Sequence, residues 1–184
     1  MDKKLYHLLL TRRVKIVHHA YMIHLTIDGK TVEAHDGETL LDAAARGGIR
    51  IPTLCYKKET PEPSVCCMIC VVKETTTARM LPACATKVAE GMAIETSTEE
   101  VRDHRRRSMQ LLNVKKGVCI ACGNCVRMSR AMNEPVGLAW HGRGATTTIA
   151  PPLGREGEEL LTNSKDACVR VCPTGAVEKL GIRN

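Results

Sequence analysis

The ten cysteines of this 184-residue chain are the side chains best suited to chemistry. Several are separated by only two residues, which suits thiolates that converge on one metal centre better than disulfides that cross a small secreted fold. No secretory signal or membrane-length apolar run is visible, since the longest apolar run near the start is Leu8–Leu10. We therefore expect a reducing, cytoplasmic setting, no membrane span, and thiolates that bind metal.

The first cysteine set has the pattern C-x11-C-x2-C-x13-C, formed by Cys55, Cys67, Cys70 and Cys84. Four thiolates that converge on two irons hold a 2Fe-2S cluster. Four thiolates also suit a closed, tetrahedral zinc site. The spacing alone leaves both metals open.

The second set begins with Cys119, Cys122 and Cys125, spaced C-x2-C-x2-C, and includes Cys172 followed by Pro173. In bacterial two-cluster ferredoxins, the cysteine before the proline ligates the other cluster of the pair. We therefore expect Cys172 to complete a 4Fe-4S cluster with the triplet.

A second cluster of such a ferredoxin would need four more thiolates at fixed positions. Those positions hold Ser129, Thr162, Lys165 and Cys168, so only one thiol remains and we expect this cluster to be lost. Cys168 is then either a packing residue or a replacement for Cys172 as fourth ligand. The intact sequence from Cys172 to Ala176 favours Cys172.

The elements that must position these cysteines follow from alternation and turn signals. Asp28-Gly29 between alternating segments predicts a hairpin, and the stretch 36–39 with Gly47-Gly48 delimits a helix. We expect a helix over 40–46, an extended stretch over 49–54, and strands over 23–27, 30–34, 71–74, 80–83 and 92–95. A small mixed sheet with one helix crossing it is the β-grasp pattern, within the α+β class.

A second helix is expected from 97 to about 112, because Ser97 and Glu100 have capping-box spacing. Its buried face would include Val101, Met109 and Leu112. After it we expect short helices behind each cysteine cluster and a hairpin near 140–149. The predicted domains are an extension over 1–20, a 2Fe-2S domain over 21–97, a linking helix over 98–113, and a ferredoxin-like 4Fe-4S domain over 114–184.

Four separated motifs in order resemble one family. They are the runs 51–56 (IPTLCY), 67–72 (CMICVV), 81–86 (LPACAT) and 90–92 (EGM). Over residues 22–112 the chain resembles the N-terminal 2Fe-2S domain of the large iron–sulfur subunit of NADH:quinone oxidoreductase, a domain shared with iron-only hydrogenases and some NAD-linked formate dehydrogenases.

The resemblance implies iron rather than zinc, and Cys67 rather than its neighbour Cys66 as ligand. Cys66 is then expected to be a buried small hydrophobe. Many members of the family also have a His-ligated cluster, but Lys115 stands where that histidine would be and His104 is too far back. We therefore expect no His-ligated cluster.

No catalytic residues are expected, because no nucleophile–base pair or phosphate-binding loop is visible and Gly142-x-Gly144 lacks a third glycine. The resemblance implies an electron-transfer subunit that docks on a flavin- and NAD-binding subunit and relays single electrons to another redox subunit or to ferredoxin. The alternative is a metal-stapled regulatory or nucleic-acid-binding protein that uses the basic run 102–107. A free ferredoxin is a third hypothesis, disfavoured by the net charge of +7.

Overall fold

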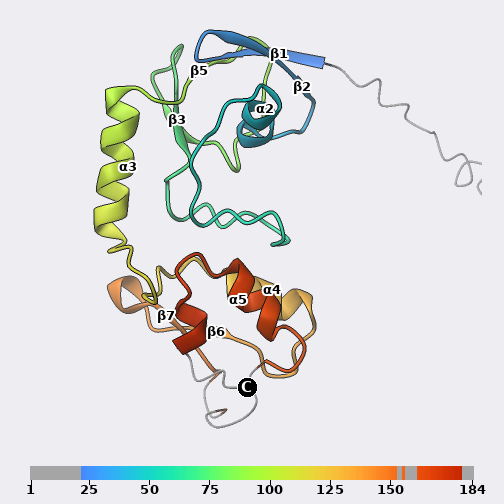
Figure 1. The fold of residues 1–184 in the computed structure, drawn as a ribbon, viewed down its shortest axis with the longest axis vertical. Helices are drawn as coiled ribbons and strands as arrows, with labels where there is room; N and C mark the ends of the chain where they lie inside the picture. The colour runs from blue at the N-terminus through green and yellow to red at the C-terminus, as the bar shows by residue number, and fades with distance from the viewer. Residues whose placement is uncertain (1–21, 153–154, 156–160, 180–184) are drawn as a thin grey trace, which may run out of the picture.

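The structure is a computed structural model that describes residues 22–152, 155 and 161–179. Two lobes follow each other along the chain, and the long helix α3 runs along one side of the molecule between them (Figure 1). The expected extension over 1–20 lies outside the described residues. No helix within the described ranges is both long enough and apolar enough to cross a membrane.

The N-terminal lobe is built on a mixed five-stranded sheet with the order β2-β1-β5-β3-β4. Its strands are β1 (Met22–Ile27), β2 (Lys30–His35), β3 (Val71–Glu74), β4 (Met80–Pro82) and β5 (Ala93–Glu95). β1 pairs antiparallel with β2 and parallel with β5, and β3 pairs antiparallel with both β4 and β5. The five predicted strands are confirmed to within one residue at each end, whereas residues 49–54, expected to be extended, form no strand.

The β1–β2 turn shows why the hairpin was predictable. Asp28 and Gly29 both have positive φ, 49° and 76°, which a two-residue turn between twisted strands requires and which Asp and Gly tolerate best. The Asp28 carboxylate also accepts hydrogen bonds from the backbone N–H and the hydroxyl of Thr96, at 2.7 and 2.6 Å. One side chain therefore fixes the turn to the end of β5.

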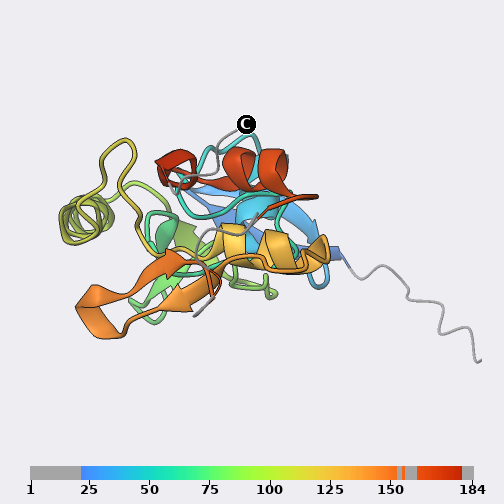
Figure 2. The ribbon, with the colours of Figure 1, turned by 90° about the horizontal axis from the view of Figure 1, so that it is seen from below.

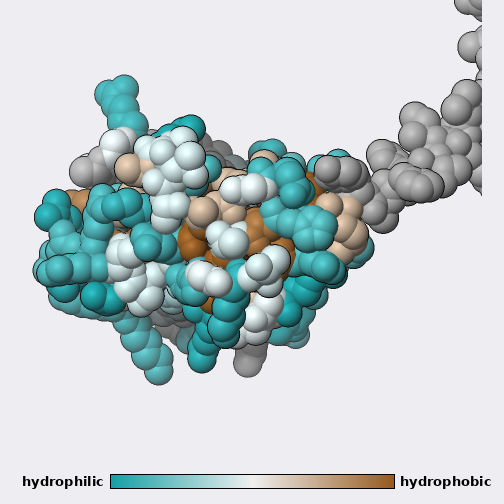
Figure 3. Space-filling model, turned by 90° about the horizontal axis from the view of Figure 1, so that it is seen from above, coloured by the Kyte–Doolittle hydropathy of each residue, from teal (hydrophilic) through white to brown (hydrophobic). Residues whose placement is uncertain are grey.

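Helix α2 (Leu40–Arg46) packs beside the sheet and has the predicted bounds. The Thr39 hydroxyl accepts from the Asp42 N–H at 3.2 Å, and the Asp42 carboxylate accepts from the Thr39 N–H, which together form a capping box. Its buried face of Leu40, Ala43 and Ala44 joins the sheet residues in one apolar core. Viewed from the end opposite the C-terminal lobe, hydrophobic residues show mainly in one central area bordered by hydrophilic ones (Figure 3).

Helix α3 (Glu99–Leu111) begins two residues after the predicted start at 97. Its N-cap is Thr98, whose hydroxyl accepts from the Val101 N–H at 3.2 Å, so the expected capping box between Ser97 and Glu100 is wrong. Val101 is fully buried, but Met109 is 41% exposed, which corrects the predicted buried face. The reason is that α3 packs on β3 along one side only while its outer side faces solvent (Figure 1).

The C-terminal lobe contains helices α4 (Asn124–Ala131) and α5 (Lys165–Val171), which pack against each other, and the hairpin of β6 (Ala139–His141) and β7 (Thr148–Ala150). The 3₁₀ turns are η1 (Gly144–Thr146) and η2 (Ala176–Lys179). The predicted hairpin is confirmed, and it projects to one side of the lobe (Figure 2). The short helix expected after Cys172 is the 3₁₀ turn η2, and α5 ends directly before that cysteine.

The carboxylate of Glu134 links the end of α4 to the start of α5. It accepts from the backbone N–H of Thr162 at 3.0 Å, from that of Asn163 at 2.6 Å, and from that of Ser164. Burial by itself would raise the pKa of Glu134, but a hydrogen bond from the Ser164 side chain, together with these backbone bonds, outweighs it and lowers the pKa to about 2. Glu134 therefore acts as a charged cap for α5.

Candidate metal centres

The first cysteine set converges at the end of the N-terminal lobe. Cys70 directly precedes β3 and Cys84 follows β4, so the antiparallel pairing of these strands brings the two residues together. Cys55 and Cys67 lie in the long loop before β3, and Met68 with φ of 53° lets the chain turn between Cys67 and Cys70. The four side chains are buried, with exposures of 1% to 3%.

The thiols of this set contact one another in two pairs, Cys70 with Cys84 and Cys55 with Cys67. A hydrogen bond from the Cys84 thiol lowers the pKa of Cys70 to about 7 and raises the pKa of Cys84. The Cys67 sulfur faces two backbone N–H groups, those of Cys55 and Ile69, each at 3.5 Å. Backbone N–H groups directed at sulfur stabilise thiolates and tune the potential of a cluster that they hold.

Cys66 lies on the solvent side of this set. The residue is exposed while Cys67 beside it is buried, and the expectation of a buried small hydrophobe at Cys66 is therefore wrong. The Cys66 sulfur still reaches Cys55, and a hydrogen bond from the Cys55 thiol lowers the pKa of Cys66. Both neighbours thus approach Cys55, and the choice of Cys67 as ligand stays a prediction that its burial supports.

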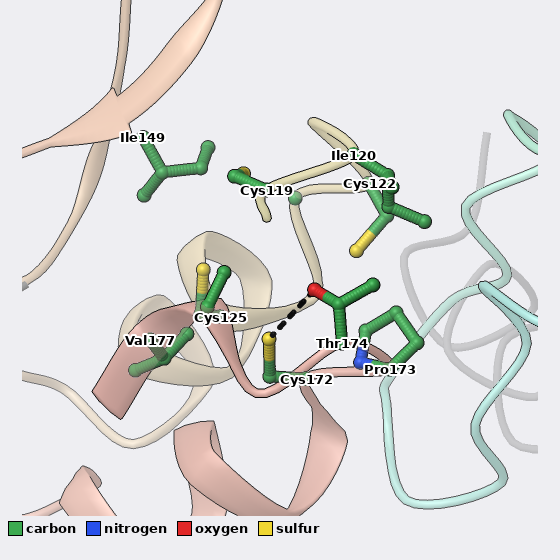
Figure 4. Close-up of a pocket in the computed structure, with 11 residues that line it drawn as sticks. Cys119, Ile120, Cys122, Cys125, Ile149, Cys172, Pro173, Thr174 and Val177 are labelled. Carbon is green, nitrogen blue, oxygen red and sulfur yellow. Dashed lines mark hydrogen bonds between the residues drawn. The ribbon is translucent and has the colours of Figure 1, made fainter. Parts of the chain in front are cut away.

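The second set lines a single cavity of about 390 Å³, part of it open to solvent, whose wall includes Cys119, Cys122, Cys125 and Cys172. The sulfurs of Cys122, Cys125 and Cys172 face the same space (Figure 4). Apolar side chains, among them Ile149 and Val177, complete the wall. This is the arrangement expected of a water-poor cradle for a metal cluster.

Tight turns form this cradle. Ala121 and Gly123 both have positive φ, at 52° and 69°, so the chain reverses direction between successive cysteines. The Ala121 N–H reaches the Cys119 sulfur at 3.4 Å, and the Asn124 N–H donates to the Cys122 sulfur. Burial raises the pKa of Cys122 to about 11, so the free thiol is neutral at pH 7 and metal binding has to release its proton.

Cys168 lies away from the cavity. Its side chain is fully buried in the apolar core between α4 and α5, and its sulfur is 3.4 Å from the Cys125 carbonyl oxygen. Ser129 is buried in the same region and donates to the Val126 carbonyl at 3.0 Å. The positions of Ser129 and Cys168, where a second cluster would need thiolates, are therefore filled by packing and internal hydrogen bonds.

The two sets lie beside each other. Cys55 and Cys67 of the first set and Cys122 of the second share one apolar cluster with Ile69 and Ile120. The loop that carries Cys55 and Cys67 is on the side of the N-terminal lobe that faces the C-terminal lobe (Figure 1). An electron carrier with two centres needs this proximity.

Sequence reasoning missed two residues that hold these loops. Arg105 was assigned to an exposed basic run, but its Nε donates to the Ile69 carbonyl at 2.9 Å and its Nη2 to the Val71 carbonyl at 2.7 Å. Asn124 stands between Cys122 and Cys125 and is fully buried. Neither had a sequence signal, because each acts on backbone that is distant in the chain.

The donor sets fit iron–sulfur clusters. Each set offers four cysteine sulfurs, the ligand type that such clusters use, and the second set encloses a space with mainly apolar walls. Within the described residues, no group of three or more His, Cys, Asp or Glu side chains is placed to hold one metal ion.

Comparisons with known proteins point the same way. Residues 20–99 match the model of the 2Fe-2S iron-sulfur cluster binding domain. The second G-type subunit of the NADH-quinone oxidoreductase of Rhizobium meliloti (strain 1021) is 28% identical over 85% of the chain, and the HndD subunit of the NADP-reducing hydrogenase of Solidesulfovibrio fructosivorans is 27% identical over 85%. The gamma subunit of the NAD-reducing hydrogenase HoxS of Cupriavidus necator is 35% identical over 62%.

The chain spans 24%, 36% and 47% of the length of these three relatives, in that order. Among solved structures, a chain of an NAD+-reducing [NiFe]-hydrogenase in the H2-reduced state superposes with a TM-score of 0.70 at 23% identity, over 84% of this chain and 86% of that one. That likeness shows a shared fold. Residues 20–99 thus match the 2Fe-2S iron–sulfur cluster binding domain, and the chain is similar to subunits of NADH-quinone oxidoreductases and NAD(P)-reducing hydrogenases.

Proposed function

We propose that the chain is an electron-transfer subunit with two iron–sulfur clusters. The ligands of the 2Fe-2S cluster are Cys55, Cys67, Cys70 and Cys84, and those of the 4Fe-4S cluster are Cys119, Cys122, Cys125 and Cys172. The observation that carries the proposal is the meeting of two separate four-cysteine sets at one apolar junction between the lobes. Bound clusters of this kind supply one-electron redox chemistry.

In this proposal the protein binds the clusters, shields them from water and fixes their orientation. Buried cysteines of the first set exclude water from their sulfurs, and the N–H groups around Cys67 and Cys122 favour the thiolate forms. The apolar cluster that Ile69 and Ile120 form with cysteines of both sets keeps bulk water out of the space between the centres. No proton-transfer group is needed for this work.

The partners are proposed from the relatives, whose names place them in NADH- and NAD(P)-linked oxidoreductases. A flavin- and NAD-binding subunit would exchange electrons with one cluster, and a second redox subunit or ferredoxin with the other. The chain would then act in the cytoplasm, as one part of a larger complex.

The structure weakens the regulatory alternative, which relied on the basic run 102–107. Arg105 points into the protein, Arg106 and Arg107 both pair with Asp103 at 2.9 and 2.6 Å, and Arg102 donates to the Ser97 carbonyl. Arg105 is therefore held against the protein, and Arg106 and Arg107 share one surface carboxylate, that of Asp103.

The test is to purify the protein anaerobically and measure iron, acid-labile sulfide and electron paramagnetic resonance (EPR) spectra after reduction with dithionite. We expect about six irons and six sulfides per chain and two distinct signals, because a 2Fe-2S and a 4Fe-4S cluster together contain that number. Replacing Cys67 by Ser should remove the 2Fe-2S signal, whereas Cys66→Ser should keep it. A colourless protein that contains zinc would contradict the proposal.

A further inference from the structure

A buried asparagine connects the two cysteine sets. Asn124 is the first residue of α4 and has no exposed surface. Its side-chain Nδ2 donates to the carbonyl of Cys55 at 2.9 Å and to the carbonyl of Val171 at 3.1 Å. Cys55 belongs to the first set, and Val171 directly precedes Cys172 of the second.

The oxygen of the same amide is held from the other side. The Ser64 hydroxyl donates to Asn124 Oδ1 at 2.6 Å, and Nη2 of Arg127 donates to it at 2.8 Å. Arg127 Nη2 also donates to the Cys122 carbonyl at 2.9 Å, and Ser64 Oγ is 3.0 Å from that carbonyl. Ser64 lies in the loop of the first lobe, so this network crosses between the lobes a second time.

The amide of asparagine fits this place because it combines two donors with an acceptor. Both donors and the acceptor are used, which is the condition under which a buried polar group stabilises a unique arrangement. An aspartate here would present no donor to Cys55 and Val171. An apolar side chain would leave both carbonyls without this hydrogen-bond donor, and the backbone segments of Cys55 and Val171 would no longer be held by the same side chain.

Asn124 links backbone segments that carry cysteines of both sets. It lies between Cys122 and Cys125 in sequence, and its side chain holds the backbone of Cys55 and the residue before Cys172. A single side chain thus fixes the relative placement of backbone segments that carry cysteines of both sets. Sliding or tilting of one lobe against the other would break these bonds.

We propose that Asn124, supported by Ser64 and Arg127, is a positioning residue that sets the separation of the two clusters and so their electronic coupling. The inference rests on the proposed function, since it requires both clusters. In the step that it serves, one cluster loses one electron and the other gains it, so no further reactant enters. Loss of the Asn124 bonds should leave each cluster in place and weaken the coupling between them.

The experiment uses the full chain with both clusters, reduced with dithionite and measured by EPR with power saturation. In the wild type we expect spin–spin broadening of the 2Fe-2S signal and faster relaxation caused by the neighbouring paramagnet. Asn124→Ala and Asn124→Asp should keep the iron content and both signals but lose the broadening. Ser129→Ala is the matched control, because Ser129 is a buried polar residue of the same helix outside the network, and it should keep the broadening.

The outcomes separate the two proposals. A wild type without two signals contradicts the proposed function itself. A wild type with two signals and no spin–spin effect, or Asn124 variants with an unchanged effect, overturns the positioning role alone. If the Asn124 variants fail to take up iron, Ser64→Ala and Arg127→Lys decide, since each removes part of the network and should reduce the broadening relative to Ser129→Ala; unchanged broadening in both overturns the role.

Discussion

Arg105 is expected to contribute more to stability than its neighbours in the basic run. Its guanidinium donates to the carbonyls of Ile69 and Val71 at 2.9 and 2.7 Å, on both sides of Cys70. The side chain is half-buried, and burial lowers its pKa although it stays charged at neutral pH. Replacing Arg105 by Ala removes both hydrogen bonds and the charge.

The size of the effect follows from these contacts. A hydrogen bond to a charged donor contributes about 1.5–3 kcal/mol, so two bonds set an upper range of about 3–6 kcal/mol. Water reaches a half-buried carbonyl once the side chain is gone, which reduces the expected loss to about 2–3 kcal/mol. Arg106→Ala is the matched control on the same helix, because its pair with Asp103 is exposed to solvent and should be worth less than about 1 kcal/mol.

The assay is urea unfolding of the protein with clusters bound, followed by circular dichroism and by visible absorbance. For Arg105→Ala the midpoint should fall by about 1 M urea, given a slope of about 1–3 kcal/mol per molar. The midpoint potential of the 2Fe-2S cluster should also become more negative, because the guanidinium charge acts on Cys70 and in the wild type favours the reduced form. Equal urea midpoints of unfolding for Arg105→Ala and Arg106→Ala would refute the reasoning.

Three further results are expected. Glu134→Gln should destabilise the protein by about 2 kcal/mol at pH 7. A carboxylate whose pKa is about 2 in the folded state and about 4.3 in the unfolded state stabilises the folded state above pH 4.3. The backbone amides of residues 162–164 should exchange faster in the variant than in the wild type, and this difference should shrink as the pH falls from about 5 towards 2. Gly123→Ala should disturb the second centre, because φ is 69° and the new methyl would lie 2.3 Å from the Trp140 ring, and the change in Trp140 fluorescence measures this. Cys172→Ser should abolish the 4Fe-4S signal while Cys168→Ser keeps it and lowers the melting temperature; the reverse result would assign Cys168 as the ligand.

Local signals determined most of the N-terminal lobe. The hairpin at Asp28-Gly29 and the helix from Leu40 to Arg46 were predictable because turn geometry and capping depend on residues within four positions of each other. The cysteine spacings likewise indicated two metal centres, because ligands two residues apart constrain each other locally. The ligand assignments themselves remain predictions.

Contacts between distant segments were decided by the tertiary structure alone. Met109 was misjudged because helical periodicity does not say how far a neighbouring lobe covers the helix. In the sequence, Arg105 is one of several arginines in a basic run and is expected to be solvated. It donates hydrogen bonds inside the protein only because the 69–71 backbone lies beside α3.

Asn124 is the clearest case of what the sequence left open. It was one unremarked position inside a C-x2-C spacing, and its partners Cys55 and Val171 are 69 and 47 residues away. A hydrogen bond depends on where two backbones meet in space, and no periodicity or spacing along the chain encodes that meeting. The sequence by itself determined that there are two cysteine sets, and the packing of the lobes determined that they lie side by side.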